Sequence, residues 1–207
     1  MSAIKNIVFD FGGVVVFLCR DKAVKAFERM GLADAEQVLD KYQQRGIFLA
    51  LEEGRMTEEE HRRKLGEMCG RQLTFDEVQA AWMAFITGVD TELLKILKTL
   101  RGKYGLYVLS NTNPYVMHWA YSSRFSPEGL PVNEYFDGLF LSYKIGTTKP
   151  DPVIFQNVFE GANIKPEETL FIDDGAANLE AAARLGLHTL LAEPDTPWKE
   201  RMLEMIR

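Results

Sequence analysis

The stretch Val8-Phe9-Asp10-Phe11-Gly12-Gly13-Val14-Val15-Val16 runs from an apolar strand into a carboxylate and then into two glycines. A strand that ends at Asp10 would hold this side chain at the edge of a sheet, where it is rigid and accessible. The glycines allow a tight bend of the backbone and the close approach of a ligand. The stretch therefore predicts a nucleophile or a metal ligand at position 10.

Four later segments are continuously apolar, as is typical of strands that are buried on both faces of a sheet. Helical patterns separate them: Asp90 precedes an amphipathic run, Asp151-Pro152 opens a second, and an alanine-rich third runs from Ala176 to Leu185. This alternation predicts a parallel sheet with helices on both faces. The predicted strands are Leu106–Ser110, Gly138–Ser142, Thr169–Asp173 and His188–Ala192.

Residues 17–88 carry helical signals and no convincing strand. The signals are helical runs at Asp21–Met30 and Asp34–Gln44, and two capping boxes that begin at Thr57 and Thr74. We therefore expect an all-helical insertion between the first strand and the rest of the α/β unit.

The composition is that of a folded protein and disfavours several classes of function. The 207 residues suffice for one domain and a modest insertion. The net charge of −6 disfavours a nucleic-acid surface, and no apolar run is long enough to span a bilayer. The N-terminus leads directly into the first strand and leaves no room for a signal peptide, and Cys19 and Cys69 form no disulfide framework. We expect a cytoplasmic monomer or homodimer with no nucleic-acid or membrane partner.

Four polar motifs lie at or near the ends of predicted strands. Asp10 ends the first strand, Ser110-Asn111-Thr112 the second and Asp173-Asp174-Gly175 a later one, whereas Lys149-Pro150-Asp151 lies in a loop before a helix. In open parallel sheets, ligands bind at the carboxyl ends of the strands. Two adjacent carboxylates also repel each other unless a cation or hydrogen bonds compensate. The sequence thus predicts one site that includes a metal ion.

These motifs resemble those of the haloacid dehalogenase superfamily, in particular its phosphatase-like members with a helical cap after the first strand. The resemblance covers essentially the whole chain. It implies a Rossmann-like core formed by residues 1–16 and 89–207 and a helical cap formed by residues 17–88. The motifs that carry the resemblance are Phe9–Val14, Ser110-Asn111, Gly146–Pro152 and Phe171–Asn178.

The resemblance implies a mechanism through an aspartyl-phosphate. Asp10 would attack phosphorus, and Lys149 would neutralise negative charge on Asp10 and on the phosphoryl oxygens. Ser110 and the backbone N–H of Asn111 would hold those oxygens during the transfer. The implied catalytic residues are Asp10, Ser110 and Lys149, and the implied phosphate-binding residues are Gly12, Ser110, Asn111 and Lys149.

The same resemblance implies a Mg²⁺ ion, which prefers an octahedral shell of oxygen ligands. Asp10 and Asp174 would supply carboxylate oxygens, and Gly12 would supply its backbone carbonyl. Asp173 would be either a further ligand or an acceptor just outside the shell. Asn178 would help to orient the acidic loop.

Gly12 departs from the family pattern. Most phosphatases of this family have a second aspartate at this position, which protonates the leaving group and then activates water. General acid–base catalysis typically contributes about 10²–10⁴-fold in rate. We therefore expect a slower enzyme, or one whose substrates leave without a proton, such as acyl, anomeric sugar or aryl phosphates.

These residues favour a Mg²⁺-dependent phosphatase that acts on a small phosphorylated metabolite. A sugar phosphate is the preferred class, because a helical cap would enclose a compact polar site. A 2-haloacid dehalogenase is one alternative, although such enzymes generally replace the acidic pair Asp173-Asp174. A binding or regulatory protein without turnover is the other, and only Gly12 favours it, whereas Asp10, Lys149 and Asp174 argue against it.

The sequence does not assign which residues of the cap would contact a substrate. We expect hinges near residues 17–19 and 88–90, because a cap that closes over the core can exclude water. For most of the basic residues in this region, we favour a solvated helix face over a substrate clamp: Arg45, Arg55, His61, Arg62 and Arg63.

Overall fold

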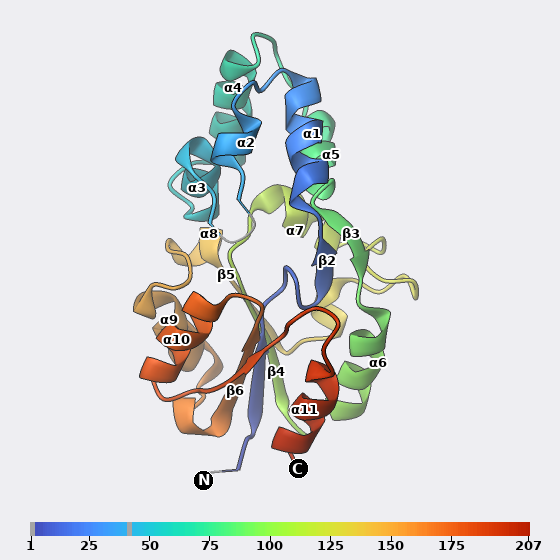
Figure 1. Cartoon of the computed structure of the whole chain (residues 1–207), viewed down its shortest axis with the longest axis vertical. Coiled ribbons are helices and arrows are strands. Elements are labelled where there is room, and N and C mark those ends of the chain that lie inside the picture. Colours follow the sequence, from blue (N-terminus) through green and yellow to red (C-terminus); the bar gives the residue numbers. More distant parts are fainter. Residues whose placement is uncertain (1–2, 41–42) are drawn as a thin grey trace.

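The computed structural model describes residues 3–40 and 43–207. Figure 1 shows two lobes along the long axis of the molecule. One lobe is a sheet flanked by helices, with both ends of the chain at its far end, and the other is a group of helices beyond the opposite end of the strands. Among the described residues, no helix is both long enough and apolar enough to cross a membrane.

The first lobe contains a five-stranded sheet in the order β5-β4-β1-β6-β7, in which every neighbouring pair is parallel. The central strand β1 pairs with β4 and β6 in a register that places Phe9 beside Val108 and Ile172. The predicted parallel sheet is therefore confirmed. The strands are β1 Asn6–Phe9, β4 Gly105–Ser110, β5 Gly138–Leu141, β6 Thr169–Asp173 and β7 His188–Leu191.

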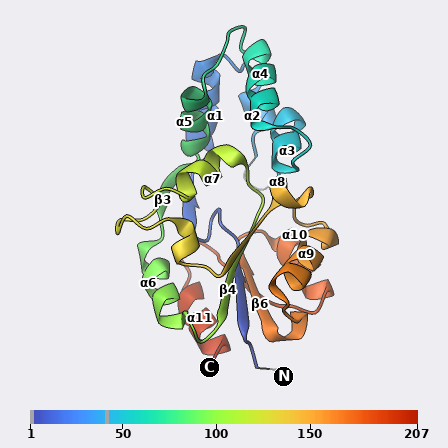
Figure 2. The same cartoon turned by 180° about the vertical axis from the view of Figure 1, so that it is seen from behind.

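Alternate side chains of the strands pack into two separate cores, one on each face of the sheet. Ile7 and Phe9 of β1 belong to one core together with α6 and α11, whereas Val8 belongs to the other together with α9 and α10. Figures 1 and 2 show these two pairs of helices on opposite sides of the sheet. This is the Rossmann-like α/β arrangement that the sequence predicted. The helices are α6 Thr91–Leu100, α9 Pro152–Ala162, α10 Ala176–Arg184 and α11 Trp198–Met205.

Two of these helices begin at the predicted capping residues. The Asp90 carboxylate accepts a hydrogen bond from the N–H of Leu93 at 2.9 Å, and that of Asp151 accepts one from Val153 at 2.8 Å. Side chains that accept such bonds satisfy backbone donors that have no partner within the helix. The connections contain the short elements α7 Pro114–Ala120, α8 Ser142–Ile145, η1 Val132–Glu134 and η2 Pro166–Glu168.

The second lobe is built from the helices of residues 19–85, which we call the helical segment. Figures 1 and 2 show it beyond the carboxyl ends of β1 and β4. Both predicted capping boxes are confirmed, because Thr57 and Thr74 each exchange hydrogen bonds with the glutamate three residues later. The helices are α1 Arg20–Met30, α2 Ala35–Val38, α3 Gly46–Glu52, α4 Glu58–Met68 and α5 Phe75–Met83.

Two short strands join the lobes, so the expectation of no strand within residues 17–88 is wrong at both ends of that range. The two strands pair antiparallel, with Val16 beside Val89. They have only three and four residues, which is too short to display a period-two pattern, and Phe17 is half exposed. Pairing between distant parts of the chain forms them instead. The strands are β2 Val16–Leu18 and β3 Ile86–Val89.

The helix predicted over Asp34–Gln44 is shorter than expected, because α2 ends within it and Leu39 already has extended backbone. The guanidinium of Arg20 donates hydrogen bonds to the carbonyls of Glu36 and Leu39, at 2.5 and 2.7 Å. A side chain of α1 thus satisfies carbonyls near the end of α2. Residues 41–42, which also belong to the predicted helix, lie outside the described residues.

Aromatic side chains fill the interior of the helical segment. The ring of Phe27 lies 5.2 Å from that of Phe48 and 5.7 Å from that of Trp82. The imidazole of His61 is fully buried and packs edge-on against Phe48 at 5.2 Å. Burial lowers the pKa of His61 to about 4. The imidazole is therefore neutral in the folded protein at neutral pH.

Acid is expected to destabilise the fold through His61. Its ordinary pKa is 6.5, so the unfolded chain binds the additional proton first as the pH falls. The stabilisation is complete above pH 6.5 and declines as the pH falls to about 4, a loss of roughly 3 kcal/mol at most. His61→Phe should flatten this part of the profile of unfolding free energy, measured with urea at several pH values.

Lys103→Met, at an exposed position outside the helical segment, provides the control and should keep the slope of the wild-type profile. A His61→Phe profile as steep as that of the wild type would show that another group causes the acid sensitivity.

Candidate active site

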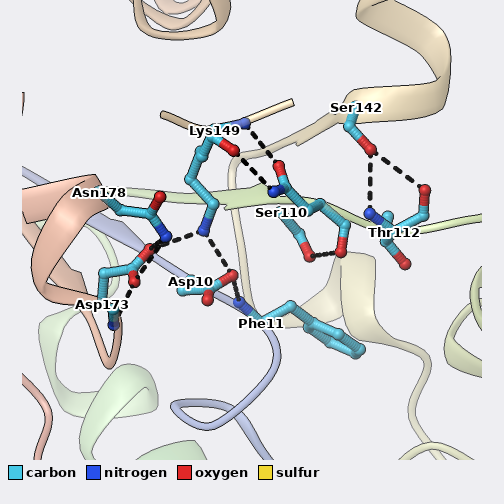
Figure 3. A network of polar contacts seen from close by, with 10 residues as sticks. Asp10, Phe11, Ser110, Thr112, Ser142, Lys149, Asp173 and Asn178 are labelled. Atoms are coloured by element: carbon cyan, nitrogen blue, oxygen red, sulfur yellow. Dashed lines mark hydrogen bonds and ion pairs between the residues drawn. The ribbon is translucent and has the colours of Figure 1, made fainter. Parts of the chain in front are cut away.

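Lys149 lies between two carboxylates at the carboxyl ends of β1 and β6. Its Nζ is 2.8 Å from Oδ1 of Asp10 and 2.7 Å from Oδ2 of Asp173, as Figure 3 shows. All three residues are buried, with 2% of Lys149 and 0% of Asp173 exposed. A buried charge is costly unless it is paired and hydrogen-bonded. The three side chains therefore depend on one another.

The chain places Asp10 directly after β1. Its N–H donates to the carbonyl of Ile172 at 2.8 Å, which continues the pairing with β6, and the N–H of Phe11 donates to its Oδ1 at 2.6 Å. Burial raises the pKa of Asp10 to about 7, although the charge of Lys149 opposes this rise. Backbone hydrogen bonds and the contact with Lys149 thus fix the position of Asp10, the predicted nucleophile.

The side chain of Asn111 positions the loop that carries Lys149. Its Nδ2 donates to the Lys149 carbonyl at 3.0 Å, and the Lys149 N–H donates to its Oδ1 at 2.7 Å. The Lys149–Pro150 peptide bond is cis. Burial alone would lower the pKa of Lys149, but Asp10 and Asp173 outweigh it and raise that pKa above its ordinary value. The ammonium group therefore stays charged.

The two carboxylates at the carboxyl end of β6 have different surroundings. Asp173 accepts hydrogen bonds from the N–H of Gly175 at 2.7 Å and from Nδ2 of Asn178 at 3.0 Å, in addition to its bond with Lys149. Asp174 lines a cavity together with Asp10. Asp173 is therefore placed to orient its neighbours, whereas Asp10 and Asp174 border the space where a ligand would lie.

Carboxylate oxygens of Asp10, Asp173 and Asp174 lie within 4.8 Å of one another. Such a cluster of oxygen donors suits a hard divalent cation, of which Mg²⁺ is one. Gly12, whose carbonyl is the further ligand that the resemblance implies, lines the same cavity as Asp10 and Asp174. The residues present therefore fit the metal that the sequence predicts.

Both glycines after Asp10 have a steric role. Gly13 has a φ of 82°, and a Cβ on it would lie 2.2 Å from Oδ2 of Asp174, so only glycine lets the backbone pass this carboxylate. A Cβ on Gly12 would lie 2.9 Å from Cδ1 of Leu18. Leu18 of β2 therefore occupies the space into which a side chain at position 12 would extend.

Two adjoining cavities lie between the sheet and the helical segment. The inner cavity, as we call the first, has a volume of about 60 Å³ and is lined by Asp10, Lys149, Asp174 and Asn178, among others. The second, which we call the outer cavity, has about 70 Å³ and is lined by Trp82, Phe85, Ser110 and Asn113, among others. Gly12 and Asn111 line both. Every predicted site residue other than Asp173 thus borders one of these two spaces.

Sequence reasoning missed the two residues of the helical segment that line both cavities, Gln44 and Glu52. Glu52 follows Phe48 by four positions, on the buried face of α3. A charged residue on such a face is uncommon and could have been noticed in the sequence. None of the five basic residues considered for a substrate clamp lines either cavity: Arg45, Arg55, His61, Arg62 and Arg63.

The model of one protein family, the haloacid dehalogenase-like hydrolases, matches residues 4–186. The chain belongs to this family. The expected membership of the haloacid dehalogenase superfamily, drawn from four short motifs, is therefore confirmed. A D-ribitol-5-phosphate phosphatase of Bacteroides thetaiotaomicron is 50% identical to this hydrolase over 199 residues, which are 96% of this chain and 97% of the relative.

Solved structures resemble the hydrolase along its whole length. A predicted HAD-like family hydrolase from Porphyromonas gingivalis has 41% identity and a TM-score of 0.94, covering 100% of this chain and 99% of that one. A HAD family enzyme from Bacteroides thetaiotaomicron, solved with magnesium and inorganic phosphate, has 36% identity and a TM-score of 0.87, covering 96% and 98% of the two chains. The arrangement of sheet and helical segment is therefore shared by related hydrolases.

Proposed function

We propose that this hydrolase is a Mg²⁺-dependent phosphatase of a small phosphorylated metabolite, with a sugar or polyol phosphate as its substrate class. The arrangement of Lys149 between Asp10 and Asp173, beside a cavity that Asp10 shares with Asp174, carries the proposal. The names of two relatives support it. One is a phosphatase of a phosphorylated polyol, and the other was solved with magnesium and inorganic phosphate.

Asp10 is proposed as the nucleophile. Both hydrogen bonds that described residues make to its carboxylate involve Oδ1, so Oδ2 is the oxygen that would attack. The Asp10–phosphorus bond forms as the bond from phosphorus to the leaving oxygen breaks, and water then displaces Asp10 from phosphorus. The products are the alcohol and inorganic phosphate, and the carboxylate of Asp10 is restored.

The remaining site residues would stabilise charge during this transfer. Mg²⁺, held by Asp10, Asp174 and the carbonyl of Gly12, would offset the repulsion between the carboxylate and the phosphate. Lys149 adds a fixed positive charge beside Asp10, and the hydroxyl of Ser110 and the N–H of Asn111 would bind the phosphoryl oxygens. Asp173 and Asn178 act through Lys149 and the acidic loop, which they hold in place.

The helical segment has to move for a substrate to enter. Cavities of about 60 and 70 Å³ are smaller than ligand pockets, which typically measure about 300–1,000 Å³. The paired strands β2 and β3 are the connections about which this motion would occur, near residues 17–19 and 88–90. In this proposal, residues 17–88 form a cap, and residues 1–16 and 89–207 form the core.

Hydrolysis of a panel of sugar and polyol phosphates that includes D-ribitol 5-phosphate tests the function. We expect release of inorganic phosphate with Mg²⁺, its loss with EDTA, and its return when Mg²⁺ is added in excess. Metal-independent chloride release from 2-chloropropionate, with no phosphate release from the panel, would instead identify a haloacid dehalogenase. The cytoplasmic location and the state as monomer or homodimer stay predictions from the sequence.

A further inference from the structure

Glu52 is a buried acid in the helical segment that the mechanism above does not use. It is the last residue of α3, and only 5% of it is exposed. No hydrogen bond or ion pair joins its carboxyl to another of the described residues. A buried carboxyl without a partner is costly to ionise. The burial of this acid is therefore unfavourable for the fold and indicates a functional role.

The two cavities meet at Glu52. A phosphoryl group in contact with Asp10 and Lys149 would occupy the inner cavity, and the rest of the substrate would then extend into the outer cavity. The oxygen that joins the two parts lies at the junction, which is bordered by the residues that line both spaces. These residues are Gly12, Leu18, Gln44, Glu52 and Asn111.

Among the residues that line both cavities, Glu52 is the one whose side chain can donate a proton. Gly12 has no side chain and Leu18 is apolar. The side-chain amide of Gln44 is engaged with the backbone of Asp40, which it contacts at 3.1 and 2.7 Å. The amide of Asn111 is engaged with the backbone of Lys149. The carboxyl of Glu52 is thus the group beside the leaving oxygen that can exchange a proton with it.

We propose that Glu52 is the general acid and base of this hydrolase, a role that rests on the phosphatase function proposed above. In the first step, the proton of Glu52 passes to the leaving oxygen as its bond to phosphorus breaks and the Asp10–phosphorus bond forms. In the second step, the Glu52 carboxylate accepts a proton from water as the water oxygen bonds to phosphorus and the Asp10–phosphorus bond breaks. Protons and charges balance, because Glu52 ends as it began.

The surroundings of Glu52 favour the protonated form with which this cycle starts. Burial raises the pKa of Glu52 to about 8, with smaller contributions from the charges of Glu53 and Asp10. The last turn of a helix also disfavours negative charge. The titratable groups that line the inner cavity with Glu52 are the carboxylates of Asp10 and Asp174 and the ammonium group of Lys149.

The acid comes from the segment that moves, whereas the nucleophile belongs to the sheet. Opening of the helical segment would therefore withdraw Glu52 from Asp10, and closure would bring it to the leaving oxygen. Proton transfer then becomes possible only when the substrate is enclosed and bulk water is excluded. This coupling assigns a catalytic reason to the closed arrangement, in which α3 lies against α8 and α5 against α7.

The experiment compares Glu52→Gln with the wild type on D-ribitol 5-phosphate and on p-nitrophenyl phosphate, both with Mg²⁺. An alkoxide needs a proton to leave, so we expect hydrolysis of the ribitol ester to fall by about 10²–10⁴-fold. Nitrophenolate leaves without a proton. With this ester the variant should release a burst of nitrophenolate nearly stoichiometric with enzyme and then stall as the aspartyl-phosphate, detected by intact-protein mass spectrometry after acid quench.

Two further variants separate this role from a structural one. Glu53→Gln changes the neighbouring residue, which lies outside both cavities, and should hydrolyse both esters at close to the wild-type rate. Glu52→Asp keeps a carboxyl and should recover part of the activity on the ribitol ester. Unchanged hydrolysis of that ester by Glu52→Gln would overturn the proposal, and so would an equal loss on both esters without a burst. A wild-type enzyme that hydrolyses neither ester would overturn the phosphatase function and the role of Glu52 with it.

Discussion

Replacing Lys149 with methionine is expected to destabilise the protein by about 3–5 kcal/mol and to abolish phosphatase turnover. Methionine keeps the length of the side chain but removes the charge that contacts Asp10 and Asp173 at 2.8 and 2.7 Å. Two buried carboxylates are then left near each other without the compensating cation. Urea unfolding in EDTA measures the first effect, and phosphate release with Mg²⁺ measures the second.

Lys103→Met is the matched control, because Lys103 is exposed and lies outside both cavities. It should have the unfolding free energy and the turnover of the wild type. Added Mg²⁺ should restore part of the stability of Lys149→Met, since a bound cation would offset the same carboxylates. An unfolding free energy of Lys149→Met equal to that of the wild type in EDTA would show that the bridge contributes nothing to the fold.

Asp10→Asn should lower kcat by about 10⁴–10⁶-fold, as losses of a catalytic nucleophile do, and should leave the protein folded. The amide has nearly the shape of the carboxylate, but it lacks the anionic oxygen that would attack phosphorus in the proposed mechanism. The substitution also relieves repulsion between Asp10 and its neighbours Asp173 and Asp174, which partly offsets the weaker contact with Lys149. Phosphate release and trapping of the phosphorylated enzyme from p-nitrophenyl phosphate measure the loss.

Asp76→Asn is the control for this variant, because it makes the same chemical change at an exposed position of α5. It should behave as the wild type in both assays. A phosphorylated enzyme trapped from Asp10→Asn would show that another residue accepts the phosphoryl group. Together, Lys149→Met and Asp10→Asn separate the two contributions of this site, because only the first is expected to weaken the fold strongly.

The core and its site could be predicted from the sequence because three of its strands end at a polar residue or just before one. Asp10, Ser110 and Asp173 follow or close three apolar strands, and parallel pairing brings such ends to one edge. The register confirms that inference, since Phe9 lies beside Ile172 and the next residues are the two aspartates that Lys149 joins. The apolar strand patterns and the parallel topology that they imply were sufficient to predict where these polar residues come together.

The helical segment could be predicted only in part, because its function depends on contacts between distant residues. The capping boxes are local, and both were found. The orientation of Glu52 depends on how a seven-residue helix packs over the sheet, and the pairing of β2 with β3 depends on the entire segment between them. The residues of β2 and β3 carry no local signal of their pairing. The only local signal for Glu52 is the presence of one acidic residue on an apolar helix face.

The pairing of Val16 with Val89 also bears on how such a chain can diversify. The polypeptide leaves the core and returns to it at adjacent points of one short ribbon, so the five-stranded sheet places little constraint on what lies between them. Because the entropy of closing a loop grows slowly with its length, an inserted module can be exchanged or enlarged at small cost to the scaffold. New specificities can thus evolve in the module while the carboxylates at the edge of the sheet and their lysine are inherited unchanged.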